Sequence, residues 1–221
     1  MSLQEKLDTF KAHWETNVAP PDAVAALHRQ TDELIASGQA DRALKAGDRA
    51  PEFTLFDSDG HPVSSTALLA KGPLVLTFYR GVWCPYCNLD LQALEEAVGS
   101  LRDLGATLVA VSQQTATFSR KAQRDNHLSF PILSDAHGDL ADAFGLRYAM
   151  PQYLIDVYKG FKLDLAEING DPSWTLPIPA RYVIAQDGVI AYAEVNPDYT
   201  TRPDPGELIP VLESLRSDAV A

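Results

Sequence analysis

A run of apolar residues that leads into two closely spaced cysteines constrains the fold of this 221-residue chain more than any other feature. Leu74–Tyr79 is almost continuously apolar, which is typical of a strand buried on both faces in the middle of a sheet. Cys84 and Cys87 follow, and the segment after them repeats apolar residues at helical spacing. This order places both thiols at the carboxyl end of a central strand, where open α/β sheets form their sites.

The elements around this unit predict an α/β fold with a central mixed sheet flanked by helices. The segment 145–178 fits no clear pattern, and its Tyr, Trp and Pro content indicates an insertion near the cysteines. We expect strands at 53–56, 74–79, 107–112 and 130–134, helices after the cysteines and over 115–126 and 138–144, a hairpin of 181–186 with 189–195, and a last helix after Asp204-Pro205.

The first 45 residues predict two helices that precede this sheet. Pro20-Pro21 ends the first helix, and Asp22 marks the start of the second. We therefore divide the chain into an N-terminal helical extension, 1–45, and a main domain, 46–221. Each helix has an apolar stripe that needs a partner surface, either the main domain or another subunit. The stripes are Leu3, Leu7, Phe10, Trp14 and Val18 in the first helix, and Val24, Leu27, Leu34 and Ile35 in the second.

Charge and hydropathy exclude several classes of partner. The formal net charge is −12, and an acidic surface repels nucleic-acid phosphates and anionic lipid. For this reason we expect no nucleic-acid partner. We also expect no membrane partner, because no apolar run reaches the roughly 20 residues that a spanning helix needs. The first residues lack the apolar centre of a signal peptide, which predicts a cytoplasmic protein.

The two cysteines, the only ones in the chain, indicate redox chemistry. A crosslink between neighbours three residues apart adds little stability. Unpaired N–H groups at a helix N-terminus stabilise a thiolate, so one sulfur can attack while the other resolves the mixed disulfide. Pro85 fits the first turn and stiffens the ring between the sulfurs. The alternatives are that the thiols are buried and inert, or that they bind a structural metal ion. A structural zinc site needs four ligands, but the chain has no second pair of cysteines and its five histidines are scattered. We therefore expect no metal and no cofactor.

Arg80 and Trp83 complete the candidate site around Cys84. Arg80 stands four residues before Cys84 at the end of the predicted strand. Its guanidinium can stabilise a thiolate there, or it can form a surface salt bridge, and the sequence leaves both open. Trp83 directly precedes Cys84. We count Arg80, Trp83 and Pro85 as supporting residues.

Several segments resemble the peroxiredoxins, a branch of the thioredoxin superfamily. They are Ala46-Gly-Asp-Arg-Ala-Pro-Glu-Phe-Thr-Leu with Asp59-Gly60, the strand before the cysteines, and Phe130-Pro-Ile-Leu-Ser-Asp135 with Gly138, Ala141 and Phe144-Gly145. The resemblance covers about residues 46–200 and implies a thioredoxin-like fold. It places the peroxide-reacting cysteine on Cys87, the family's Thr on Cys84 and its Pro on Arg80. Where peroxiredoxins carry an Arg, this chain has Pro179, which resembles the cis-proline of thioredoxins or is simply a proline at a strand start. On the first interpretation we count Pro179 as a fourth supporting residue of the site.

The resemblance leads to three functional hypotheses. The first is a thiol-dependent antioxidant enzyme that reduces hydroperoxides through Cys84 and Cys87. The second is a thiol–disulfide oxidoreductase without significant peroxidase activity, and the third is a redox-sensing or interaction module that uses the N-terminal helices. The peroxiredoxin template makes Cys87 the attacker and the thioredoxin template makes it Cys84; we favour Cys87 for peroxides and Cys84 for protein disulfides. The family's Thr and Arg donors are absent at the matched positions, and Arg80 and Arg181 are the candidates to replace them. The implied partners are a hydroperoxide or disulfide substrate, a thioredoxin-like or small-thiol reductant, and a second copy in a homodimer.

Overall fold

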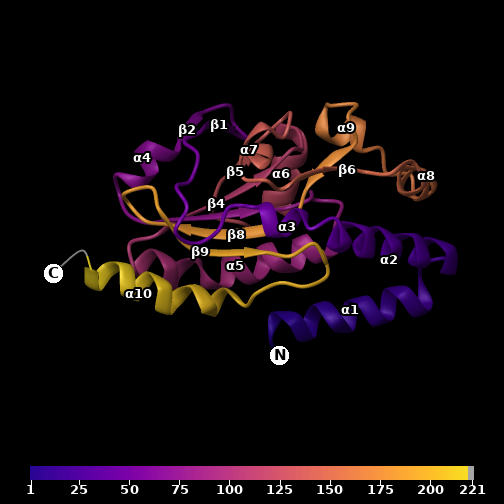
Figure 1. Cartoon of the computed structure of the whole chain (residues 1–221), viewed down its shortest axis with the longest axis horizontal. Helices are drawn as coiled ribbons and strands as arrows, with labels where there is room; N and C mark the ends of the chain where they lie inside the picture. The colour runs from indigo at the N-terminus through magenta and orange to yellow at the C-terminus, as the bar shows by residue number, and fades with distance from the viewer. Residues whose placement is uncertain (219–221) are drawn as a thin grey trace.

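The computed structural model describes residues 1–218 and consists of a large mixed sheet covered by helices on both faces (Figure 1). Within these residues no helix is both long and apolar enough to cross a bilayer. The helices are α1 Leu3–Asn17, α2 Pro21–Ala36, α3 Gln39–Arg42, α4 Ser65–Leu69, α5 Pro85–Asp103, α6 Ala116–Asp125, α7 Asp139–Ala143, α8 Gln152–Gly160, α9 Leu165–Asn169, the 3₁₀ turn η1 Pro205–Glu207 and α10 Leu208–Asp218. The strands are β1 Thr54–Asp57, β2 Pro62–Ser64, β3 Leu74–Phe78, β4 Thr107–Ser112, β5 Ile132–Ser134, β6 Arg147–Ala149, β7 Thr175–Pro177, β8 Ala180–Ile184 and β9 Ile190–Val195.

The main sheet has the strand order β2-β1-β5-β4-β3-β8-β9, which confirms the predicted central mixed sheet. Strands β3, β4 and β5 run parallel, and β8 pairs antiparallel to β3 before it turns into β9. Every residue of β3 is buried, as its continuous apolar run predicts for a central strand. The carboxyl end of β3 therefore lies in the middle of the sheet, and the cysteine loop begins there.

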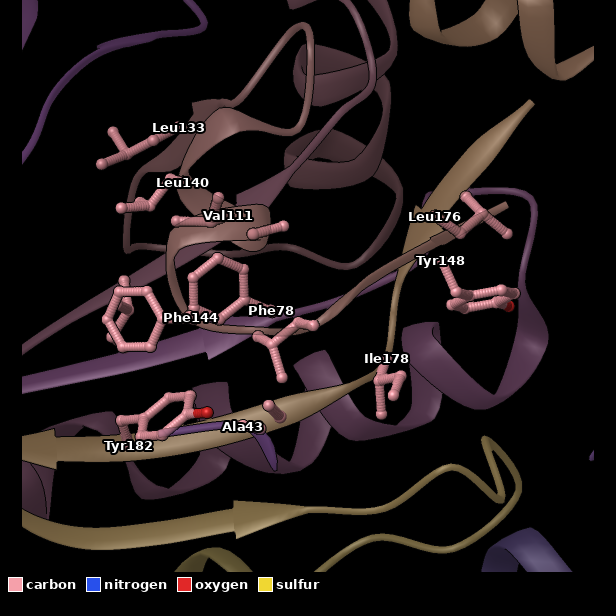
Figure 2. Packing of buried hydrophobic residues seen from close by; sticks show 14 of the residues in the cluster. Ala43, Phe78, Val111, Leu133, Leu140, Phe144, Tyr148, Leu176, Ile178 and Tyr182 are labelled. Carbon is pink, nitrogen blue, oxygen red and sulfur yellow. The ribbon is translucent and has the colours of Figure 1, made fainter. Parts of the chain in front are cut away.

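Alternating side chains of β3 divide the core into two layers. Leu74, Leu76 and Phe78 face one layer, where Phe144 packs against Phe78 and Tyr182 at ring-centroid distances of 5.1 and 4.8 Å (Figure 2). On the opposite face, Val75 and Tyr79 pack with apolar residues of α1, α5 and α10. Helices α2, α7 and α8 cover the first face. The loop that leads from β3 to the cysteines thus leaves the sheet between two packed layers.

The N-terminal helices α1 and α2 form a hairpin at one end of the molecule and pack on the rest of the chain (Figure 1). Leu3 and Leu7 are buried against α5, and α2 packs against α8. The predicted stripe of α2 is wrong at one position, because Ile35 is 53% exposed and the buried face continues through Gln30 and Leu34 instead. The helix also starts at Pro21, since proline fits a first helical position. The division of the chain at residue 45 stays a prediction.

The segment 145–178 is folded rather than irregular. It contains the two-stranded sheet of β6 and β7 and the helices α8 and α9, none of which the sequence pattern indicated. Two short elements near the start of the sheet, β2 and α4, were also missed. All of these elements have nine residues or fewer, too few to establish a period. Helix α8 matters most for the site, because it places Tyr158 against the cysteine loop.

The docking of α1 can be tested through Leu7, whose side chain is fully buried. We expect Leu7→Ala to lower the free energy of unfolding by about 2 to 5 kcal/mol, because it leaves a cavity between α1 and α5. Val18→Ala, at the 60% exposed end of the same stripe, is the matched control and should change it by under about 0.5 kcal/mol. Chemical denaturation measures both values, and equal effects would show that α1 does not pack as described.

Candidate active site

The loop from Tyr79 to Cys84 is held in one conformation by side chains from neighbouring elements. The backbone N–H of Val82 donates to Gln114 Oε1 at 2.9 Å, and its carbonyl accepts from Asn88 Nδ2 at 2.8 Å. Gly81 has φ +146°, and a Cβ there would lie 2.4 Å from the indole nitrogen of Trp83. The glycine therefore lets Trp83 fold back over the loop, and Cys84 follows in a fixed position.

The two cysteines occupy different positions at the start of α5. Cys84 is the N-cap residue, Pro85 is the first helical residue and Cys87 lies in the first turn, as predicted. Both thiols are free and each residue is only 1% exposed. Cys84 lines a cavity of 330 Å³ that opens to the surface, whereas Cys87 is not among the residues that line it. Cys87 is instead enclosed by α5 and the loop before α10.

Arg80 is buried directly beside Cys84, so its interpretation as a surface salt bridge is wrong. It is 1% exposed, and its Nη1 donates to Cys84 Sγ at 3.8 Å while Nη2 donates to the Tyr158 hydroxyl. The guanidinium carbon lies 3.9 Å from the ring centroid of Tyr199 and 4.9 Å from that of Trp83, within the range of cation–π attraction. Aromatic residues from three segments therefore fix the positive charge next to one sulfur.

Electrostatics separate the two thiols. Burial alone would raise the pKa of Cys84, but hydrogen bonding to Cys87 and the charges of Arg80 and Arg202 outweigh it and lower this pKa to about 6. Burial raises the pKa of Cys87 well above its ordinary range, and the neighbouring Cys84 raises it further. At neutral pH the pair therefore holds one negative charge, on Cys84.

Arg202 is the charged residue of this site that the sequence did not reveal, beside Tyr158 and Tyr199. Its Nη2 donates to Cys87 Sγ at 3.6 Å, and its Nε lies 3.4 Å from a carboxylate oxygen of Asp90. The other oxygen of Asp90 pairs with Arg181, which the sequence offered beside Arg80 as a replacement for the family's missing donors. Arg181 contacts Asp90 and donates to the Pro203 carbonyl. The available signal was Asp90 itself, an acidic residue on the apolar face of α5 one turn after Cys87, since a buried carboxylate needs a cation.

The remaining supporting residues fall into two groups. Trp83 and Pro85 line the cavity with Cys84. Pro179 is buried at the start of β8, outside the cavity lining, and its peptide bond is trans, so the resemblance to a thioredoxin cis-proline is wrong. No group of three or more metal-ligating side chains is assembled within residues 1–218. The site thus consists of two thiols, two guanidinium groups and the aromatic side chains that contact them.

Comparison with known proteins shows which family this chain matches. The AhpC/TSA family matches residues 46–193. The putative peroxiredoxin Rv1608c of Mycobacterium tuberculosis is 29% identical over 114 residues, which are 52% of this chain and 74% of that protein. The thiol-disulfide oxidoreductase ResA of Halalkalibacterium halodurans is 33% identical over 110 residues, 49% of this chain and 61% of that protein.

The fold agrees with the sequence matches. The crystal structure of peroxidoxin BcpB from Mycobacterium tuberculosis superposes with a TM-score of 0.61 at 22% identity, covering 79% of this chain and 97% of the other. At this identity the likeness concerns the fold alone, and it confirms the predicted thioredoxin-like architecture. Because the family match spans most of the sheet and the cysteine loop, this chain belongs to the AhpC/TSA family and is a peroxiredoxin-like member of the thioredoxin superfamily.

Proposed function

We propose that this chain is a thiol-dependent peroxidase in which Cys84 attacks the hydroperoxide and Cys87 resolves the product. One observation carries the assignment: Cys84 lines the cavity beside Arg80 with a pKa lowered to about 6, whereas Cys87 is enclosed with a raised pKa. A thiolate that substrate can reach is the nucleophile that O–O cleavage requires. These roles reverse the ones implied by the family's sequence template, and the membership itself supports the peroxidase activity.

In the first step the Cys84 thiolate attacks the terminal oxygen of a hydroperoxide. A sulfur–oxygen bond forms and the O–O bond breaks, which gives a sulfenic acid on Cys84 and an alkoxide, or hydroxide from hydrogen peroxide, that takes up a proton. The Arg80 guanidinium lies within reach of Cys84 Sγ and offers fixed positive charge to the oxygens as negative charge develops on them. Arg80 thereby does the work of the donors absent from the sequence template.

In the second step Cys87 attacks the sulfenic sulfur, so that a disulfide forms and water leaves. The negative charge of the Cys84 thiolate helps to raise the pKa of Cys87, and oxidation to a neutral sulfenic acid removes this repulsion. Arg202 then favours the ionised form of Cys87 through its contact with the sulfur. The order of ionisation, first Cys84 and then Cys87, follows from this arrangement.

An external dithiol, or two small thiols, reduces the disulfide and closes the cycle. A hydroperoxide substrate and a thioredoxin-type reductant agree with the family, and a small thiol is the alternative. A homodimer and a cytoplasmic location stay predictions. The stripe on α1 that motivated an interaction module is occupied at Leu3 and Leu7 by packing within this chain.

Thiol–disulfide exchange is the second candidate function, favoured by the spacing of the cysteines and by the match to ResA. Exchange with a protein disulfide needs a sulfur at the surface, because the partner's sulfurs must line up with it. Cys84 is 1% exposed and lies at a cavity partly covered by α1 and α2. The geometry therefore favours a small substrate over a protein disulfide.

Replacing each cysteine by serine assigns the two roles. Cys84→Ser should abolish hydroperoxide consumption. Cys87→Ser should consume about one equivalent and stop at a sulfenic acid that dimedone traps, because the resolving thiol is gone. Stopped-flow peroxide assays and mass spectrometry measure both outcomes. The assignment is reversed if Cys84→Ser forms the trapped sulfenic acid on Cys87.

The pH dependence tests the Arg80–Cys84 pair. Since the thiolate is the reacting form, kcat/KM for hydrogen peroxide should rise with pH through about 6 and level off above it. In Arg80→Met the guanidinium no longer opposes the effect of burial on the Cys84 pKa. The midpoint of the pH–rate curve should therefore move to higher pH, and the rate at neutral pH should fall about tenfold or more. Arg80→Lys should keep part of the shift, and Arg29→Met removes an exposed arginine as the control. An unmoved midpoint in Arg80→Met contradicts the role of this residue.

Arg202 is tested through the second step alone. Arg202→Met should slow disulfide formation after a peroxide pulse by about tenfold or more, because the Cys87 thiolate loses its neighbouring cation. The first step, followed by peroxide loss, should change much less. Quench-flow with mass spectrometry separates the two, and Arg202→Lys should restore part of the rate. If Arg202→Met slows only peroxide loss, Arg202 serves Cys84 and not Cys87.

A further inference from the structure

Tyr158, on α8, brings a buried hydroxyl to the cavity at Cys84. The residue is 4% exposed and lines the cavity together with Cys84 and Arg80. Arg80 Nη2 donates to the hydroxyl oxygen, and this bond leaves the phenolic proton free to be donated in turn. Within residues 1–218 that proton makes no hydrogen bond to a protein acceptor, although a buried tyrosine usually finds one. Tyr158 therefore offers a donor to a molecule that enters the cavity.

Arg80 holds this hydroxyl beside the reacting sulfur. Its Nη1 donates to Cys84 Sγ at 3.8 Å and its Nη2 donates to the Tyr158 hydroxyl, so one planar guanidinium contacts both groups along the same edge. Trp83 packs edge-to-face on the Tyr158 ring, with the ring centroids 5.3 Å apart, and holds the ring in place. A peroxide that lies along this edge places one oxygen at the sulfur and the other at the hydroxyl. The hydroxyl is thus close to the position at which negative charge develops on the leaving oxygen.

The other donors at the site differ from Tyr158 in what they can do with a proton. Arg80 Nε and Trp83 Nε1 are buried without a hydrogen-bond partner, but a guanidinium does not give up its proton in proteins and an indole N–H serves only as a hydrogen-bond donor. Tyr86 and Tyr199 also line the cavity. Tyr199 meets Arg80 with its ring face, 3.9 Å from the guanidinium carbon, and Tyr86 packs on Tyr199 at 5.4 Å. Tyr158 therefore holds the transferable proton that Arg80 positions.

We propose that Tyr158 is the general acid of the first step and gives its phenolic proton to the leaving oxygen of the peroxide. The inference rests on the proposed peroxidase function and adds a catalytic residue to it. Cys84 Sγ bonds to the attacked oxygen, which keeps its hydrogen as the sulfenic acid. The O–O bond breaks, and the leaving oxygen takes the proton of Tyr158 and departs as water or an alcohol.

The environment of Tyr158 suits a proton that is released only during the reaction. Burial raises the pKa of Tyr158 above its ordinary value, so the hydroxyl is protonated at neutral pH, when Cys84 is already a thiolate. The leaving oxygen becomes hydroxide or an alkoxide, which is basic enough to take that proton. The charge of Arg80 opposes the effect of burial and stabilises the tyrosinate that results. A proton from solvent then restores Tyr158.

Two small oxidants test the proton transfer in the full-length protein. Hydrogen peroxide releases hydroxide, which needs a proton, whereas peracetic acid releases acetate, a weak base that leaves without one. Tyr158→Phe should lower the second-order rate constant for oxidation of Cys84 by hydrogen peroxide about a hundredfold, and that for peracetic acid by less than about threefold. Tyr153→Phe is the matched control on α8, since its hydroxyl bonds Glu33 outside the cavity, and it should change neither rate. An equal loss with both oxidants in Tyr158→Phe overturns the inference and leaves the peroxidase in place.

Alkylation separates proton donation from the positioning of Arg80. Iodoacetamide reacts with the Cys84 thiolate and releases iodide, which takes no proton. In Tyr158→Phe the alkylation of Cys84, followed by mass spectrometry, should keep its pH midpoint at about 6. A midpoint that moves upward far enough to account for the whole loss of rate with hydrogen peroxide shows that Tyr158 acts only through Arg80, and this result contradicts the inference.

A solvent isotope effect tests the unmodified protein, so the inference stays falsifiable if Tyr158→Phe does not fold. Above the midpoint of the pH–rate curve, oxidation of Cys84 by hydrogen peroxide should be slower in D₂O than in H₂O, and oxidation by peracetic acid should not. The absence of an effect with hydrogen peroxide overturns the proton transfer. If the unmodified protein consumes neither oxidant, the peroxidase proposal fails and this inference falls with it, whereas failure of the inference alone leaves the unmodified protein active.

Discussion

The site depends on a guanidinium group that is buried without a carboxylate. Arg80 is 1% exposed, and within residues 1–218 the buried carboxylate of Asp90 pairs with Arg181 and Arg202 rather than with Arg80. A buried charge is costly unless an opposite charge compensates it, and an arginine does not give up its proton. Of the titratable groups beside it, burial raises the pKa of Tyr158, whereas the pKa of Cys84, 3.8 Å away, is lowered to about 6. The protein thus stabilises the thiolate because the alternative leaves a positive charge unpaired in an apolar interior.

At the second sulfur, that of Cys87, the effects that raise the pKa outweigh those that lower it. Arg181 and Arg202 share Asp90, and Glu194, whose pKa burial raises, lies in the same cluster. Cys87 is therefore next to cations, yet it stays protonated while Cys84 carries the negative charge. In the proposed cycle, oxidation of Cys84 would remove that charge and leave Arg202 beside Cys87. In that cycle one electrostatic arrangement orders two ionisations, first that of Cys84 and then that of Cys87.

The sequence predicted what local patterns determine. The strand β3, the cysteines at the start of α5 and the hairpin of β8 and β9 depend on residues that are close in the chain, so apolar runs, a proline and a turn sufficed to place them. Arg202 lies 115 residues from Cys87, and Tyr158 lies 78 residues from Arg80, so no periodicity connects them. The exposed Ile35 shows the same limit, because helical spacing gives a stripe but not its edges. Contacts that tune the thiols come from tertiary packing, which single-sequence patterns do not encode.

Covering a reactive thiol with α1 and α2 has two physical effects that oppose one another. Exclusion of water strengthens the attraction between Arg80 and the Cys84 thiolate, because charges interact more strongly in a medium of low dielectric constant. The same burial raises the thiol pKa, and hydrogen bonding to Cys87 together with the charges of Arg80 and Arg202 reverses that effect. The covering also restricts which molecules reach the sulfur, and this restriction applies to reductants as much as to peroxides. In the proposed cycle the disulfide would lie beneath the same helices. A reductant would then either enter through the cavity or displace the α1–α2 hairpin from its contacts with α5 and α8.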